Sequence, residues 1–271
     1  MKRFFLALAV TVLPALASAQ AVTVKGSDTM VILSQRWAEN YMKANPGKRV
    51  QVTGGGSGVG IAALINGTTD VANASRAMKE AEKARVRDRY NVLPTEIPVA
   101  KDGLAVYVNE SNPIEQLTLD QLRKIYAGDV TNWKDVGGPD AKIVLYSREN
   151  SSGTYVFFKD NVLKGDDFAA AAQTLPGTAA VVNATAKEKF GIGYGGAAYA
   201  KGVKEVKLVG KDGQAYLPSA ENVASGKYPL ARDLFVYTRG KPSGEAKAFI
   251  EFCLSPEGQA VVTTVGYFPV K

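Results

Sequence analysis

Three short segments of this chain combine glycines, hydroxyl side chains and, in one case, an arginine. They are residues 22–30, 50–60 and 143–154, and each runs from a β-type stretch through a Gly/Ser turn into an apparent helix start. A helix N-terminus presents unpaired backbone N–H groups and a partial positive charge, so it attracts anions. The three turns together predict several helix N-termini directed at one small oxyanion.

The third segment carries the most specific signal, because Arg148 precedes Ser151, Ser152, Gly153 and Thr154. Arginine offers a permanently charged planar fork that matches phosphate oxygens. The hydroxyls and free N–H groups that follow can bind the same ion, and glycine lets the backbone approach it closely. The residues alone leave an alternative open, in which a serine is an ordinary helix cap and the arginine belongs to a surface ion pair.

The glycine-rich turn at residues 54–60 lacks the Lys-Ser/Thr end of a nucleotide-binding P-loop. A dinucleotide fingerprint would need an acidic residue after the next strand, but Ser75 and Arg76 stand there. An oxyanion contacted by the Ser57 hydroxyl is the favoured interpretation, and a turn without ligand remains the alternative. Arg76 is then either a second cation at the site or a solvated loop arginine.

These turns need a scaffold, and the first part of the chain predicts a parallel sheet. Strand and helix patterns alternate, with strands at residues 22–25, 49–53 and 70–74 and helices at 30–44 and 59–66. Such β-α-β-α-β order favours parallel strands joined by right-handed crossovers. Trp37 and Tyr41 lie on one helix face and are predicted core residues. Further on, residues 96–100 and 104–109 read as two strands, and residues 244–264 as a helical region broken at Ser255-Pro256.

Two extended apolar runs, at residues 103–108 and 233–237, have a similar pattern and are predicted to be crossings between two lobes. The expected fold is therefore α/β with two lobes, each a mostly parallel sheet flanked by helices, and with the ligand in the cleft between them. The predicted division is a signal peptide at 1–19, a first lobe from 20–102 and 233–271, and a second lobe from 103–232.

The first residues predict export. Lys2 and Arg3 precede an apolar run at residues 4–16, and Ala17-Ser18-Ala19 has the form of a signal-peptidase site. The mature chain would begin at Gln20 and is expected to be soluble. The net charge of +7 becomes +5 without Lys2 and Arg3, and its scattered cations do not indicate nucleic-acid binding.

The composition also removes several classes of chemistry. The chain has no histidine and a single cysteine, Cys253, so it cannot build Ser-His-Asp or Cys-His nucleophile systems or the usual zinc sites. Cys253 lies in an apolar helical pattern and is expected to be a buried core thiol. We therefore expect no metal and no cofactor.

Taken in order, the motifs resemble the periplasmic phosphate-binding proteins of ABC transporters over essentially the whole predicted mature chain. The matching segments are Gly26-Ser27-Asp28-Thr29, residues 54–58, Ala74-Ser75-Arg76, residues 104–109, Ile125 to Trp133, Arg148 to Thr154, and residues 255–259. The resemblance implies the type II periplasmic binding protein fold, with two lobes that close on the ligand.

The resemblance also implies which residues contact phosphate. These are Ser27, Thr29, Ser57, Arg76, Arg148, Ser152, Gly153 and Thr154, with Ser75 and Ser151 as weaker candidates. Some family members have an aspartate where Arg76 stands, and that carboxylate accepts the proton of hydrogen phosphate. Asp28 is the candidate for this role here.

The implied function is binding without catalysis. A monomeric protein of the periplasm would capture inorganic phosphate and deliver it to the membrane permease subunits of an ABC transporter. Two alternatives stay open: a binding protein for sulfate, molybdate or phosphonate, and an exported phosphatase that uses Ser57 or Ser152 as nucleophile.

Overall fold

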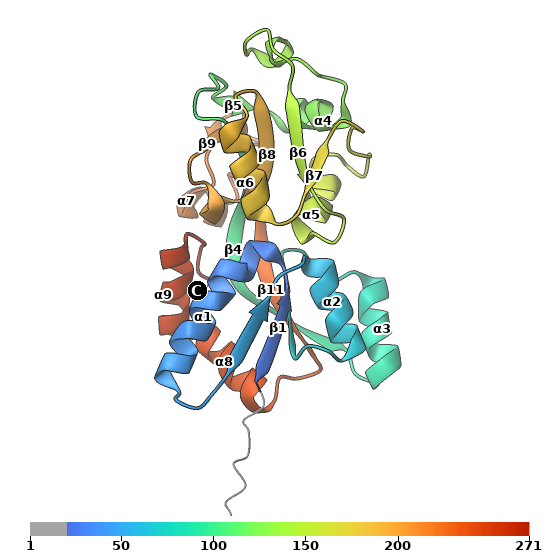
Figure 1. The fold of residues 1–271 in the computed structure, drawn as a ribbon, viewed down its shortest axis with the longest axis vertical. Coiled ribbons are helices and arrows are strands. Elements are labelled where there is room, and N and C mark those ends of the chain that lie inside the picture. Colours follow the sequence, from blue (N-terminus) through green and yellow to red (C-terminus); the bar gives the residue numbers. More distant parts are fainter. Residues whose placement is uncertain (1–20, 271) are drawn as a thin grey trace, which may run out of the picture.

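The computed structural model describes residues 21–270, which form two lobes joined by long strands (Figure 1). The predicted signal peptide lies outside the described residues. None of the helices between residues 21 and 270 has the length and apolar character that crossing a membrane would require.

The first lobe is built on a sheet with the strand order β2-β1-β3-β11-β4. The strands β1, β2 and β3 are mutually parallel, as predicted, whereas β11 runs antiparallel to both β3 and β4. The bounds are β1 Val22–Gly26, β2 Val50–Thr53, β3 Val71–Ala74, β4 Pro94–Val108 and β11 Ala231–Arg239.

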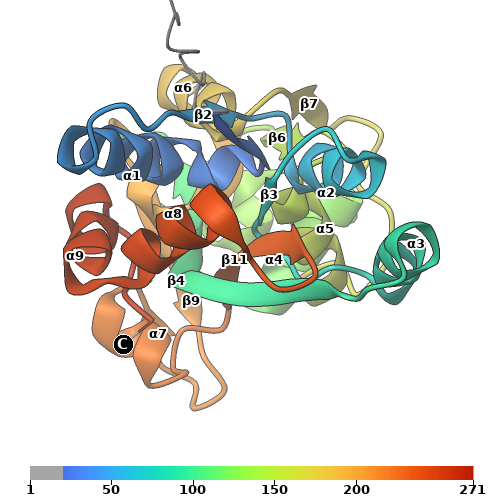
Figure 2. The same ribbon diagram turned by 90° about the horizontal axis from the view of Figure 1, so that it is seen from below.

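Helices cover both faces of this sheet (Figure 2). One group is α1 (Val31–Ala44), α8 (Gly244–Leu254) and α9 (Pro256–Val265); the other is α2 (Ser57–Asn66) and α3 (Glu80–Tyr90). Trp37, Tyr41 and Cys253 are buried in the core beneath α1, α8 and α9, which confirms their predicted packing. The break between α8 and α9 falls at Ser255, whose hydroxyl caps α9, so the predicted interruption is confirmed.

The second lobe has its own apolar core and a sheet that continues from β4 through β8 and β6 to β7. Tyr126, Phe158 and Tyr194 pack edge-on or stacked at its centre. The strands are β5 Gln116–Leu117, β6 Val144–Arg148, β7 Gln173–Leu175, β8 Gly191–Gly196, β9 Lys204–Val209 and β10 Ala215–Tyr216. The helices are α4 Leu119–Ala127, α5 Gly153–Asn161, α6 Thr178–Lys187 and α7 Ala220–Ala224.

The two strands expected at residues 96–100 and 104–109 are one continuous strand, β4, so that prediction was wrong. The intervening Lys101 and Asp102 look like a turn in the sequence, but they pair in register with Asp233 and Arg232 of β11. Opposite charges across the ladder keep these residues in the strand. As a result β4 pairs with β11 in its first part and with β8 in its second part, and it joins the two sheets.

Glu205, on β9, is a half-buried carboxyl group whose Oε1 has no hydrogen-bond partner within residues 21–270. Burial, together with the negative charge of Asp102, raises the pKa of Glu205 from 4.5 to about 7. The native state therefore holds this proton more tightly than the unfolded chain does. Its contribution to stability is fully present below about pH 4.5 and is lost as the pH rises towards 7.

We therefore expect Glu205→Gln to stabilise the protein at pH 8 by about 1–2 kcal/mol, after allowance for solvent screening, and to have little effect at pH 4.5. Urea unfolding at both pH values measures this difference. A stability difference that is the same at both pH values would contradict the assignment.

Candidate functional site

Four hydroxyl groups from separate parts of the chain meet where the two lobes touch. Thr29 lies in a 3₁₀ turn before α1, Ser57 begins α2, Ser75 follows β3, and Thr154 lies in the first turn of α5. The Oγ1 atoms of Thr29 and Thr154 are 2.9 Å apart, and Ser75 Oγ lies 3.4 Å from Ser57 Oγ and 3.5 Å from Thr154 Oγ1. All four residues are buried. We call these four residues the hydroxyl cluster.

Ser152 and Gly153 shape the α5 side of the cluster. Ser152 Oγ accepts hydrogen bonds from the backbone N–H groups of Thr154 and Tyr155. It is therefore the N-cap of α5, which was one of the two roles that the sequence left open for a serine here. Gly153 lies so close to the opposite lobe that a Cβ atom there would be 2.3 Å from Ser57 Oγ and 2.7 Å from Ser75 Oγ. Only a residue without a side chain fits between the two lobes at this position.

Ser27 and Ser151 are held by backbone hydrogen bonds. Ser27 directly follows β1 and donates its N–H to the carbonyl of Asn73. The carbonyl of Ser151 accepts the N–H of Gly58 across the lobe junction, at 2.8 Å. Gly56 presses against the same carbonyl, where a Cβ atom would be 2.6 Å from the oxygen. The glycine-rich turn therefore lies directly on the second lobe.

Arg148, the last residue of β6, is 1% exposed, and four of its five guanidinium N–H groups donate to side chains. It donates to Thr178 Oγ1 at 2.8 Å, to Asp28 Oδ2 at 2.9 Å and to both carboxylate oxygens of Glu149. This geometry excludes the alternative of a surface ion pair. Burial alone would raise the pKa of Glu149, but the hydrogen bonds and positive charge of Arg148 hold it below its ordinary value.

Asp28 connects the lobes. Its Oδ1 accepts the N–H of Gly55 in the glycine-rich turn, and its Oδ2 accepts from Arg148 in the second lobe. The carbonyl of Asp28 also accepts the hydroxyl of Tyr199. Both oxygens of this carboxylate are therefore already hydrogen-bonded, one to each lobe.

Arg76 is not brought into the cluster, which corrects the expectation of a second cation there. Its guanidinium donates to both oxygens of Glu82, at 2.8 and 2.7 Å, and to the carbonyl of Ala77. Glu82 lies in the first turn of α3, where its carboxylate also accepts the N–H of Lys79. A bidentate partner six residues away holds Arg76 outside the site.

A different arginine, Arg232, takes the place beside the cluster, and sequence reasoning missed it. Arg232 donates to Thr154 Oγ1 at 3.1 Å and to the carbonyl of Ser75 at 3.2 Å. Its counter-charge is Asp102 on β4, which is fully buried. A signal was present, because the two charges lie immediately before the predicted crossings at 103 and 233.

The arrangement suits an anion bound mainly by hydrogen bonds. The charged groups around the cluster are two arginines, Arg148 and Arg232, and three carboxylates, Asp28, Asp102 and Glu149, a net charge of −1. Donor dipoles, rather than net charge, must therefore stabilise a bound oxyanion. Within residues 21–270 no group of His, Cys, Asp or Glu could hold a metal ion.

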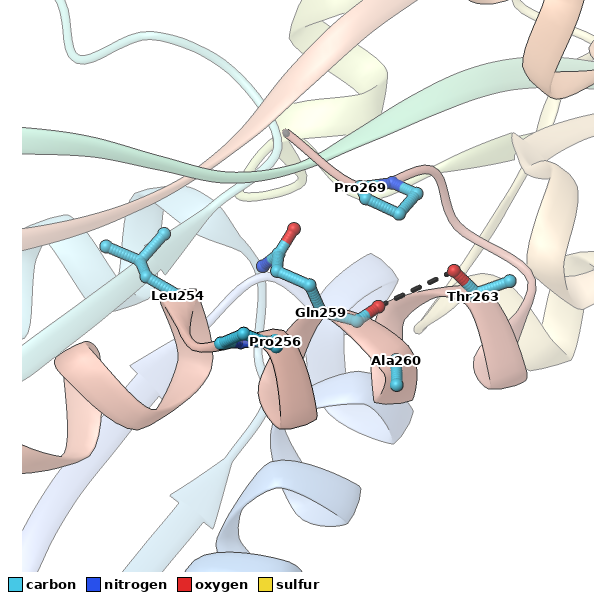
Figure 3. Close-up of a pocket in the computed structure, with 6 residues that line it drawn as sticks. All are labelled: Leu254, Pro256, Gln259, Ala260, Thr263 and Pro269. Atoms are coloured by element: carbon cyan, nitrogen blue, oxygen red, sulfur yellow. Dashed lines mark hydrogen bonds between the residues drawn. The ribbon is translucent and has the colours of Figure 1, made fainter.

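A separate pocket lies beside α9, on the side of the first lobe (Figure 3). It is lined by Leu254, Pro256, Gln259, Ala260, Thr263 and Pro269 of α8, α9 and the segment that follows. It shares no residue with the hydroxyl cluster and offers no charged group.

Comparison with known proteins places the chain among binding proteins. A family model described as the PBP superfamily domain matches residues 14–257. A protein of Pseudomonas aeruginosa named phosphate-binding protein PstS is 38% identical over 263 residues, covering 90% of this chain and 81% of the relative. A protein of the same name from Staphylococcus epidermidis is 34% identical and covers 87% of this chain and 75% of the relative.

Solved structures agree. A phosphate ABC transporter substrate-binding protein from Clostridium perfringens, solved with bound phosphate, superposes with a TM-score of 0.84 at 30% identity, covering 93% of this chain and 100% of that one. An ABC-type phosphate transport receptor from Vibrio cholerae gives 0.73 at 29% identity, with 92% and 100% coverage. These neighbours share the predicted two-lobed α/β fold, which is thereby confirmed.

Proposed function

Since the chain belongs to the PBP superfamily and, within it, to the phosphate-binding proteins named PstS, we propose that it captures inorganic phosphate between its lobes and delivers it to an ABC permease. The observation that carries this function to the present chain is the buried hydroxyl cluster, which joins residues of both lobes. We further propose that it acts in the periplasm, as a monomer and without catalysis.

In this proposal phosphate contacts Ser27, Thr29, Ser57, Ser152, Gly153 and Thr154 through hydroxyl and backbone N–H groups, and Arg148 supplies the charge. Charge-assisted hydrogen bonds contribute about 1.5–3 kcal/mol each, so a few of them suffice for tight binding after the entropy cost of association. Ser75 gains support from its place in the cluster. Ser151 is supported as a backbone contact between lobes more than as a hydroxyl ligand.

Closure of the lobes on the ion is the second part of the proposal. The hinge would lie in β4 and β11, at the proposed boundaries 102/103 and 232/233, so that residues 103–232 move against the rest. The pairs Gly58–Ser151 and Asp28–Arg148 join the lobes and support such closure. The permease would recognise the closed form.

Asp28 is the proposed acceptor for the proton of hydrogen phosphate. Asp28 directly precedes Thr29 of the cluster, and its carboxylate accepts a hydrogen bond from Arg148. A carboxylate facing the ligand repels a fully ionised anion such as sulfate, whereas a protonated phosphate can donate a hydrogen bond to it.

Calorimetric titration of the purified protein with phosphate, sulfate and molybdate between pH 5 and 8.5 tests the function. We expect phosphate to bind at least about 10-fold more tightly than sulfate, which is on the order of one hydrogen bond. Equal affinities would remove Asp28 as the selective group, and no binding of phosphate would reject the function. Turnover of a phosphomonoester would favour the phosphatase alternative.

A further inference from the structure

Arg232 and Asp102 form a buried ion pair at the two points where the chain passes between lobes. They are directly opposed in the β11–β4 ladder, and their side chains are 3% and 0% exposed. Arg232 donates from Nε and Nη2 to the same oxygen, Asp102 Oδ2, at 2.9 and 2.8 Å. The pair therefore lies within the strands that would bend if the lobes moved.

The remaining donors of Arg232 reach both lobes. Nη1 donates to the carbonyl of Ser75 in the first lobe, and Nη2 donates to Thr154 Oγ1 in the second. The guanidinium also lies over the ring of Phe157 on α5, 5.2 Å from its centre. One side chain thus connects β11, the end of β3 and the start of α5.

This contact decides how the hydroxyl of Thr154 is oriented. A guanidinium has donors and no acceptor, so Thr154 Oγ1 must accept from Arg232. The hydrogen of Thr154 is then directed to another acceptor, such as Thr29 Oγ1 at 2.9 Å or a bound anion. Without Arg232 the same oxygen would be free to accept a hydrogen bond from a protonated ligand.

We propose that Arg232, held by Asp102, is a positioning residue that makes Thr154 a hydrogen-bond donor to the bound oxyanion and ties that contact to the inter-lobe strands. The inference rests on the proposed phosphate function. The sequence had offered Arg76 as a second arginine at the site. In the structure the arginine that contacts the cluster is Arg232.

The test must keep the fold intact, because removing Arg232 alone would leave Asp102 buried and unpaired. The double variant Asp102→Leu/Arg232→Met replaces the pair with apolar groups of similar size, a change that is often neutral for stability. Arg239→Met is the matched control: Arg239 lies on the same strand and donates to the carbonyls of Leu64 and Thr69, far from the hydroxyl cluster.

Phosphate affinity is measured by calorimetry at pH 5.5 and pH 8.5, with thermal unfolding alongside. We expect the double variant to bind phosphate about 10- to 100-fold more weakly at pH 8.5, while Arg239→Met stays within about 2-fold of wild type. The loss should be smaller at pH 5.5, because the more protonated phosphate can donate to the freed Thr154 oxygen.

A folded double variant with wild-type affinity would overturn the inference. A loss of equal size at both pH values would also overturn it, because a purely structural role predicts no dependence on ligand protonation. Failure of the wild-type protein to bind phosphate would instead reject the proposed function, so the two failures are distinguishable.

Discussion

Arg148→Ala is expected to weaken phosphate binding by about 2–5 kcal/mol, the largest loss at any single position of the site. Arg148 is buried, and it faces the carboxylates of Asp28 and Glu149. Its removal deletes the charge partner of the anion and also leaves two negative groups uncompensated beside the ligand. Both effects act against a bound phosphate, and titration calorimetry measures their sum.

The control for this variant is Arg36→Ala, because Arg36 is an exposed arginine paired only with Glu39 on α1. It should bind phosphate as the wild type does. Thermal unfolding distinguishes lost binding from lost fold, since Arg148 also joins β6 to α6 through Thr178. A folded Arg148→Ala protein with unchanged affinity would remove Arg148 from the site.

Gly153→Ala is expected to cost about 1–3 kcal/mol of binding free energy, the usual penalty for overpacking a tight site. The added methyl group would lie 2.3 Å from Ser57 Oγ and 2.7 Å from Ser75 Oγ. The two lobes must then separate slightly or the serines must turn away, and either change removes donors from the anion. Titration with phosphate measures the loss.

Gly165→Ala, just beyond α5, provides the comparison for Gly153→Ala. Gly165 has a φ of +93° and no atom within 4 Å of an added Cβ, so alanine strains the backbone there without touching the cluster. We expect this variant to lose about 1 kcal/mol of stability and to keep its phosphate affinity. If Gly153→Ala bound phosphate normally, close approach at that position would not be required.

Much of the fold could be predicted because it depends on local patterns. The alternation of strands and helices through residues 22–74 follows from apolar periodicity and turn residues, and the observed β1, β2 and β3 are parallel as expected. The break at Ser255 follows from the restriction that proline places on its predecessor. The continuous β4 could not be predicted, because Lys101 and Asp102 remain in the strand only through their partners on β11, Asp233 and Arg232, which lie 132 and 130 positions further along the chain.

The residue types at the candidate site could be predicted in the same way, whereas their contacts with a ligand stay predictions. Hydroxyl residues and glycines at helix starts can be recognised from the local sequence. In the structure Thr29, Ser57 and Thr154 lie in one cluster. The partners of an arginine are harder to predict, because its long side chain goes where a carboxylate and an acceptor are available. Arg76 pairs with Glu82 and does not contact the hydroxyl cluster, whereas Arg232 pairs with Asp102 across the ladder and donates to Thr154.

The sequence by itself determined the class of fold and placed hydroxyl groups, glycines and Arg148 in short turns before helices. These properties reside in residue types and short spacings, which dictate helix starts, close backbone approach and hydrogen-bonding capacity. Only the tertiary structure decided which arginine stands beside the hydroxyl cluster and which carboxylates balance the charge. Those choices depend on distances between segments far apart in the chain, and buried charges are held in place by the specific partners that folding brings within hydrogen-bond reach.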